Sequence, residues 1–190
     1  MITIHLANSV ELHQADALVR RVYGAQGLGD HGLHGEGDTF VVCNGCHMVG
    51  TLSLVVDGPQ GVPADDMFKD TLDELRASGA RLCELTRFVL ETQSPSAKLL
   101  HDLFHALHRH GVANYDCTDL IIQADPRHCF FYRRRLGFKP LGPVVWYPQF
   151  NTQGQLLRIH VSELSRHFEP QLHNHNPTHN EQERRFRRVG

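Results

Sequence analysis

The sequence predicts a mixed α/β domain, in which helices alternate with the strands of a single sheet. Apolar runs typical of strands alternate with longer segments whose apolar residues recur every three or four positions, as in helices. The dipeptide Asn44-Gly45 separates two apolar runs, which is a strong signal for a tight hairpin. The 190 residues, 41% of them hydrophobic, are enough for one domain with its own core.

The first elements follow from local patterns. Residues 2–7 alternate in polarity and should form a strand. A helix capped by Asn8 or Ser9 should follow, and residues 39–57 should form the hairpin. Between them, residues 24–38 contain six glycines and are expected to form a long loop, whose length is typical of a functional segment.

The second half continues the alternation. Residues 64–79 should form a helix that ends near Gly79, and residues 81–91 a strand. Ser94 and Pro95 are a typical cap and first-turn pair for a helix that reaches residue 111. The remaining elements are expected to be a buried strand at 118–124, a helix from Pro126 to about Leu136, and two strands within 139–148 and 154–164.

Domain organisation follows from a change in composition near residue 170. Residues 1–169 carry the alternating apolar pattern and are expected to form one domain. Residues 170–190 contain almost no apolar residues but several histidines and arginines. They are therefore expected to form a polar C-terminal tail.

Composition excludes several classes of function. The formal net charge of −2 does not favour binding to nucleic acid or to an anionic membrane. No apolar run approaches the ~20 residues of a membrane-spanning helix, and the N-terminus lacks the pattern of a signal peptide. The protein is therefore expected to be cytoplasmic, with no integral membrane segment.

Cysteine and histidine patterns give no strong metal signal. Five cysteines are an odd number, which argues against a disulfide framework. Cys43 and Cys46 form a CxxC pair, which is found in redox proteins and zinc sites, but no second ligand pair stands at a zinc-finger spacing. Two structural cysteines beside a turn are therefore favoured. His101, His105 and His108 would share one helix face, which is more typical of a polar surface than of a metal site. No metal is expected.

Glu84 stands in the middle of a strand that should lie inside the sheet. Carboxylates are seldom fully buried unless they are paired. One interpretation is a salt bridge at the end of the strand. The other is a carboxylate in a cleft, where loss of hydration raises its pKa toward that of a general base.

Longer blocks of the sequence resemble a known family. The order of strands and helices, together with the segment FYRRRLGF, is similar to the GNAT acyltransferase fold. Residues 50–91 and 119–143 resemble the N-acyl amino acid synthases of the FeeM type, which are related to acyl-homoserine-lactone synthases. The resemblance covers about residues 10–165. It implies a sheet whose central parallel strands splay apart, with the acyl thioester lying in the gap.

The resemblance also implies which residues form the site. An E-x-[ST]-R element of the wider family falls on Glu84, Thr86 and Arg87, and implies catalytic roles for Glu84 and Arg87. Glu84 would face the gap and deprotonate the amine, while Arg87 or Arg20 would hold the carboxylate of the acceptor. Residues expected to contact the substrates are Arg20, Tyr23, Thr86, His128, Tyr132 and Arg133.

The implied reaction transfers a fatty acyl chain from acyl carrier protein to the amine of an amino acid or a related small amine. The donor would be an acyl-phosphopantetheine thioester, with no tightly bound cofactor. Acetyl-CoA enzymes have glycines in their phosphate-binding loop where this chain has Ser96 and Lys98, which favours the carrier protein over CoA. A CoA-dependent N-acetyltransferase and a non-catalytic acyl- or partner-binding module remain the alternatives.

The segment after Pro126 is expected to serve both packing and binding. Phe131, Leu136 and Phe138 should pack the helix and the next strand onto the sheet. Tyr132 and part of the arginine run should face the mouth of the cleft and the carrier protein.

Overall fold

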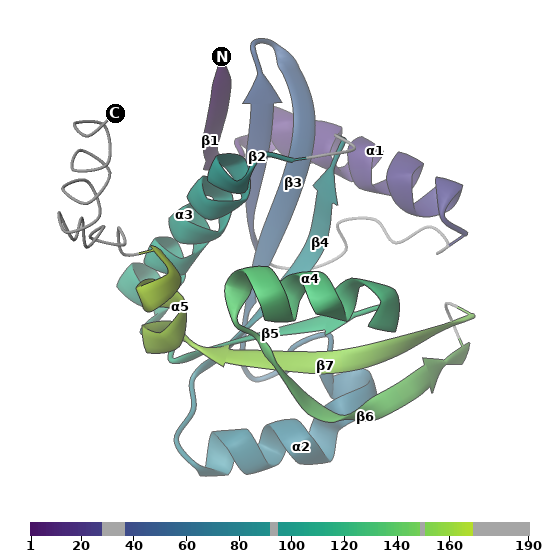
Figure 1. Cartoon of the computed structure of the whole chain (residues 1–190), viewed down its shortest axis with the longest axis vertical. Coiled ribbons are helices and arrows are strands. Elements are labelled where there is room, and N and C mark those ends of the chain that lie inside the picture. The colour runs from purple at the N-terminus through teal and green to yellow at the C-terminus, as the bar shows by residue number, and fades with distance from the viewer. Residues whose placement is uncertain (28–36, 92–94, 149–150, 169–190) are drawn as a thin grey trace, which may run out of the picture.

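The computed structural model describes residues 1–27, 37–91, 95–148 and 151–168 (Figure 1). The expected order of strands and helices is confirmed, with one further helix at the C-terminal end. The elements are β1 (Ile2–Leu6), α1 (Ser9–Ala25), β2 (Asp38–Asn44), β3 (His47–Val56), α2 (Asp65–Ala77), β4 (Leu82–Leu90), α3 (Ala97–Tyr115), β5 (Asp119–Ala124), α4 (Pro126–Leu136), β6 (Lys139–Tyr147), β7 (Thr152–His160) and α5 (Val161–Phe168).

The seven strands form one mixed sheet in the order β1-β2-β3-β4-β5-β7-β6. The central strands β4 and β5 are parallel, and the other described neighbours are antiparallel. In Figure 1, β2, β3 and β4 stand roughly upright, with β3 antiparallel to its two neighbours, whereas β5 and β7 lie across the picture. The two halves of the sheet therefore differ sharply in direction where β4 meets β5.

The parallel strands pair only over a short length. Their register runs from Leu82 opposite Asp119 to Leu85 opposite Ile122 and stops there, although β4 continues to Leu90 and β5 to Ala124. Just beyond this point β4 bulges against β3, and Arg87 takes the left-handed φ of 54° that side chains other than glycine rarely adopt. The expectation that the central parallel strands part is confirmed.

Helices cover both faces of the sheet. Alternate residues of a strand point to opposite faces, so Leu85 of β4 joins a core with α3, α4 and α5, while its neighbours on the other face meet α2. On that second face Phe68 and Leu72 of α2 pack on Ile121. α1 packs farther along the same strands through Leu18 and its neighbours. Glu84, next to Leu85, consequently points toward α2.

Three local expectations were wrong by a few residues. The two residues that connect β2 and β3 are Gly45 and Cys46, one position later than expected, because the left-handed φ of 61° falls on Gly45. Helix α3 begins at Ala97, since the Ser96 hydroxyl accepts the backbone N–H of Leu99 at 3.1 Å. The last expected strand ends at residue 160, and α5 follows it directly.

Some expectations fall on residues that the structure does not describe. These are most of the glycine-rich loop (28–36), Ser94 as a helix cap, and the polar tail (170–190) with its domain boundary. Among the described helices, none is long and apolar enough to cross a membrane.

Candidate active site

Glu84 is buried in the paired part of β4, with only 1% of its surface exposed. Its Oε2 accepts the backbone N–H of Ala64 at 2.7 Å, and its Oε1 accepts Nε2–H of Gln123 at 2.7 Å. Burial raises the pKa of Glu84 to about 7, although these two hydrogen bonds act in the opposite direction. Glu84 is therefore a carboxyl group poised between its neutral and charged forms at neutral pH.

The Ala64 donor is held in place by the start of α2. Ala64 is the N-cap of α2, and the backbone N–H of an N-cap has no partner inside its own helix, so it can bind a residue from the sheet. Arg76, near the end of α2, forms salt bridges with Asp57 and Asp65, both at 2.7 Å. These contacts tie α2 to the segment after β3 and fix the N–H over Glu84.

Gln123 connects Glu84 to the point where the strands part. It lies on β5 immediately after Ile122, the last residue that pairs with β4, and it is half-buried. Its Oε1 in turn accepts the hydroxyl of Tyr147 from β6. Gly154 of β7 makes room for that tyrosine, because a Cβ on this glycine would lie 2.1 Å from the ring.

Gln123 and Tyr147 were not predicted as site residues. The only signal in the sequence is that Gln123 is a polar residue near the end of an otherwise apolar strand. The expected orientation of Glu84 also differs from the structure. Its side chain is buried and faces the start of α2, and Gln123 links it to the parting strands.

Arg20, Tyr23 and Arg87 are brought together from α1 and the bulge of β4. Arg87 is near enough to Tyr23 and Asp16 for their charges to act on it, while its own burial lowers its pKa. Burial raises the pKa of Tyr23 to about 12, against the effect of the Arg87 charge. Arg20 forms an i,i+4 salt bridge with Asp16 at 2.8 Å. A cationic cluster therefore lies beside the bulge.

Thr86 lies between Glu84 and this cluster. Its hydroxyl is buried and has no hydrogen-bond partner within the described segments. The Thr51 hydroxyl of β3 is also buried and has no hydrogen-bond partner among the described residues. Buried hydroxyls normally find partners, so this part of the sheet is a place where a polar ligand would improve the hydrogen bonding.

Tyr132 is buried in an aromatic cluster, and its expected position at the mouth of a cleft is wrong. Only 7% of it is exposed, because its ring packs against Phe131 at 5.1 Å and Phe88 at 6.4 Å between centroids. Phe88 also meets Phe104 of α3 at 5.4 Å. Burial raises the pKa of Tyr132, and Tyr23 on the opposite face acts in the same direction. Tyr132 therefore lies in the aromatic core of this face and not at its surface.

The expected packing of Phe131, Leu136 and Phe138 is confirmed, since all three belong to the core formed by α3, α4 and α5. The other predicted residues of α4 lie at the surface. His128 and Arg133 are exposed, as are Arg134 and Arg135. Phe130 is 72% exposed on the same helix. α4 therefore presents a basic outer surface with an aromatic ring in it.

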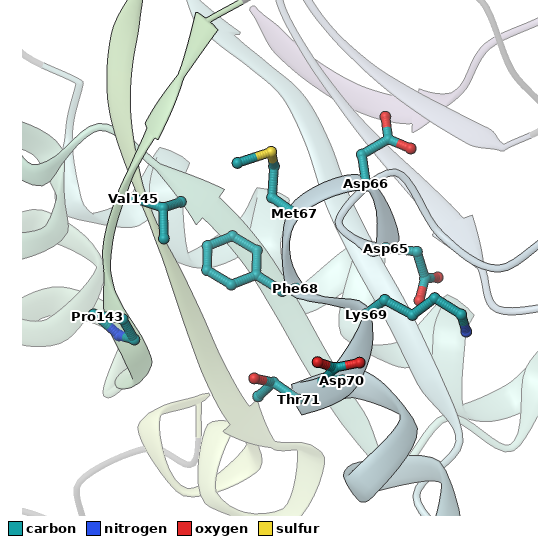
Figure 2. A pocket seen from close by; sticks show the side chains of 9 residues that line it. All are labelled: Asp65, Asp66, Met67, Phe68, Lys69, Asp70, Thr71, Pro143 and Val145. Carbon is teal, nitrogen blue, oxygen red and sulfur yellow. The ribbon is translucent and has the colours of Figure 1, made fainter.

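An open pocket of about 350 Å³ lies between the first turns of α2 and β6. Figure 2 shows Met67 and Phe68 gathered with Val145 on one side of it, and Asp65 and Asp66 on the other. The pocket contains none of the predicted site residues. However, the Phe68 ring packs on Tyr147 with 6.4 Å between centroids, and the Tyr147 hydroxyl is two hydrogen bonds away from Glu84.

The parted parallel strands, the bulge and the helices on both faces define the GNAT acyltransferase fold. A family model described as "N-acyl amino acid synthase FeeM" matches residues 14–160, which is more than half of the chain. The chain therefore belongs to the FeeM N-acyl amino acid synthase family and is an N-acyltransferase. The resemblance inferred from the sequence is confirmed.

Solved structures agree with this assignment. FeeM, an N-acyl amino acid synthase from uncultured soil microbes, is 26% identical, with a TM-score of 0.78 over 88% of this chain and 95% of its own. The acyl-homoserine-lactone synthase LasI shares the fold at 16% identity, with a TM-score of 0.61 over 85% of this chain and 90% of its own. An N-acetyltransferase from Staphylococcus aureus Mu50 also shares the fold, at 11% identity and with a TM-score of 0.58, over 85% of this chain and 99% of its own. The comparison with curated proteins found no match.

Proposed function

We propose that the protein joins a fatty acyl chain from acyl carrier protein to the amine of an amino acid, at the point where β4 and β5 part. The observation that carries this proposal is the hydrogen bond between Glu84 and Gln123, which spans the two strands just where their pairing ends. It places a carboxyl group with a pKa of about 7 beside the parting strands of an N-acyltransferase.

Glu84 is the proposed proton acceptor. An amine is protonated at neutral pH and cannot attack a thioester until it loses a proton. Among the described carboxyl groups with a resolved change, Glu84 is the one whose pKa is raised, and all the others are lowered. Its Oε1 becomes available when the Gln123 amide turns away, and Gln123 is half-buried at the edge of the gap. Catalytic hydrogen bonds often form only in the substrate complex.

The cationic cluster beside the bulge is the proposed site for the carboxylate of the acceptor. Arg87 would provide the bidentate contact. Arg20, which forms a salt bridge with Asp16, would be a second cation beside it. The buried Thr86 hydroxyl, next to Arg87 on β4, and the Tyr23 hydroxyl, which feels the Arg87 charge, would bind the acceptor's polar atoms. The amine would then lie between this cluster and Glu84.

The aromatic cluster on the opposite face is the proposed seat of the acyl chain. Phe88 follows the bulge and contacts Phe104, Phe131 and Tyr132, so an alkyl chain inserted between the parted strands would meet these rings first. In the reaction the amine nitrogen forms a bond to the thioester carbon. The carbon–sulfur bond breaks, and the thiolate of the pantetheine arm takes up a proton as it leaves.

The basic surface of α4 is the proposed docking surface for the carrier protein. His128, Arg133 and Arg134 would meet the acidic partner and the pantetheine phosphate there. A phosphate-binding loop for CoA has less support. The Ser96 hydroxyl accepts the backbone N–H of Leu99 at the start of α3, so this N–H is not available to a phosphate. The exposed Lys98 forms a salt bridge with Asp102. All five cysteines are free thiols, which supports action in the reducing cytoplasm.

An assay with the purified protein tests the proposal. The protein is incubated with carrier protein that bears an acyl chain, or with acyl-CoA, in the presence of a panel of amino acids. Products are identified by mass spectrometry. We expect an N-acyl amino acid from the carrier-protein donor, with one free thiol released for each product. If product forms with acyl-CoA but not with the acylated carrier protein, the proposed donor is wrong. Absence of any product, with a folded protein and acyl chains of several lengths, would favour a binding module.

A further inference from the structure

Three side chains of metal-binding type converge near the N-terminus, outside the candidate active site. They are His5 of β1, Glu11 in the first turn of α1 and Cys43 of β2, and their ligand atoms all lie within 4.8 Å of one another. His5 Nε2 and Glu11 Oε1 are 2.8 Å apart. Along the sequence the three residues are too far apart to form a recognisable motif, which is why the sequence predicted no metal site.

The fold places each of the three ligands on one face of the sheet. β1 and β2 pair so that Thr3 lies opposite Cys43 and His5 opposite Val41. Because side chains two residues apart on a strand share a face, His5 and Cys43 point to the same side. α1 starts there, and its N-cap fixes Glu11.

Glu11 is held in a position suited to a ligand. The backbone N–H of Asn8 donates to Glu11 Oε2 at 2.9 Å, and the Asn8 side chain accepts the backbone N–H of Glu11 at 3.0 Å. Glu11 Oε1 is then directed toward His5. Such outer contacts orient the ligands in protein metal sites.

We propose that His5, Glu11 and Cys43 bind a zinc ion. An imidazole nitrogen, a carboxylate oxygen and a thiolate sulfur are the three ligand types that Zn²⁺ prefers. In tetrahedral coordination, zinc bonds of about 2.0 to 2.3 Å set neighbouring ligand atoms about 3.3 to 3.6 Å apart. His5 Nε2 and Glu11 Oε1 are 2.8 Å apart, and all three ligand atoms lie within 4.8 Å of one another, so modest adjustments reach these distances.

Small side-chain rotations are enough to admit the ion. The His5 side chain is 43% exposed, so water can reach the site and supply a fourth ligand. The bound ion replaces the hydrogen bond between His5 and Glu11, and Cys43 releases its thiol proton to solvent. The ion would tie β1, β2 and the start of α1 together. It would thereby anchor the helix whose other end carries Arg20 and Tyr23.

Cobalt spectroscopy on the full-length protein tests the site. Co²⁺ substitutes for Zn²⁺, and its bond to a thiolate gives a charge-transfer band that histidines alone cannot give. The histidine-rich segment 170–190 contains no cysteine and is therefore silent in this measurement. We expect one equivalent of Co²⁺ to give the band under reducing conditions, and one equivalent of Zn²⁺ to remove it.

Two matched cysteine variants decide which thiol binds. Cys43→Ser should abolish the band, whereas Cys46→Ser, which changes the exposed cysteine of the same turn, should keep it. His5→Ala should keep the band but weaken Co²⁺ binding by at least about tenfold, since even outer contacts to a metal ligand contribute 10- to 100-fold. No band in the wild type, a band in Cys43→Ser, or loss of the band in Cys46→Ser would overturn the proposal.

Discussion

Glu84 is kept away from water, and two amide donors satisfy its carboxylate. Both donors come from distant parts of the chain, the start of α2 and the end of β5. Desolvation outweighs these hydrogen bonds and raises the pKa to about 7. The same residue therefore lowers the stability of the fold at neutral pH and makes a proton acceptor available there.

The raised pKa predicts how stability changes with pH. From about pH 4.5 to 7 the folded protein keeps a proton on Glu84 that the unfolded chain releases, so this group makes the free energy of unfolding fall as pH rises. The full effect is up to about 3 kcal/mol. In Glu84→Gln the group is absent. Urea unfolding should show the variant gaining stability over the wild type across this range, and a difference that does not vary with pH would contradict the shift.

Helix α2 and the edge strand β6 together hold Glu84 in place. The salt bridges of Arg76 fix α2. Tyr147 of β6 reaches Gln123 because Gly154 of β7 leaves room for the tyrosine ring. The three-residue chain Tyr147–Gln123–Glu84 thus depends on the close approach of β6 to β7. A methyl group at Gly154 would displace the tyrosine.

Gly154→Ala tests this dependence. The added Cβ would lie 2.1 Å from the Tyr147 ring, so we expect a loss of about 1–3 kcal/mol in the free energy of unfolding and a fall in kcat. Gly24→Ala is the control, because no atom lies within 4 Å of its Cβ and the residue is in α1. The control should not lose stability, and a gain of up to about 1 kcal/mol is expected because alanine favours a helix over glycine. Equal effects of the two substitutions would contradict the packing argument.

The sequence predicted elements better than contacts. Periodicity located eleven of the twelve elements, but α5 follows β7 without a break, and its first residues continue the alternation of apolar and polar residues along β7. Glu84 could be predicted because a carboxylate inside an apolar strand is unusual. Its link to Gln123 and, through Gln123, to Tyr147 could not, since these residues come from other strands and only the sheet order brings them together. The burial of Tyr132 likewise depends on Phe88 and Phe104, which are distant in sequence.

At the scale of the molecule, the two faces of the sheet have different characters. The face under α1 and α2 carries polar and charged residues, including Glu84, Thr86 and Arg87. The face under α3 and α4 is aromatic, and the outside of α4 is basic. A polar acceptor and an acyl donor would therefore approach the parted strands from opposite sides.

Charge reversal on α4 tests the approach of the donor. Arg134→Glu should raise KM for acyl-carrier protein several-fold at low salt and less at high salt, because a surface charge acts through screened attraction. KM for the amino acid should not change. Lys69→Glu reverses an exposed charge on α2, on the other face, and should leave both KM values unchanged. An equal effect of the two variants would show that α4 has no special part in docking.

The most direct test is the kcat of Glu84→Gln. The variant should fold, because the Gln123 amide can turn over, accept the new amide's N–H and donate to the Tyr147 hydroxyl, while Ala64 N–H keeps its acceptor. If Glu84 accepts the proton of the amine, kcat should fall by at least about 100-fold while the variant still unfolds in one cooperative transition, at least as stable as the wild type at neutral pH. A kcat within about twofold of the wild type would contradict that role.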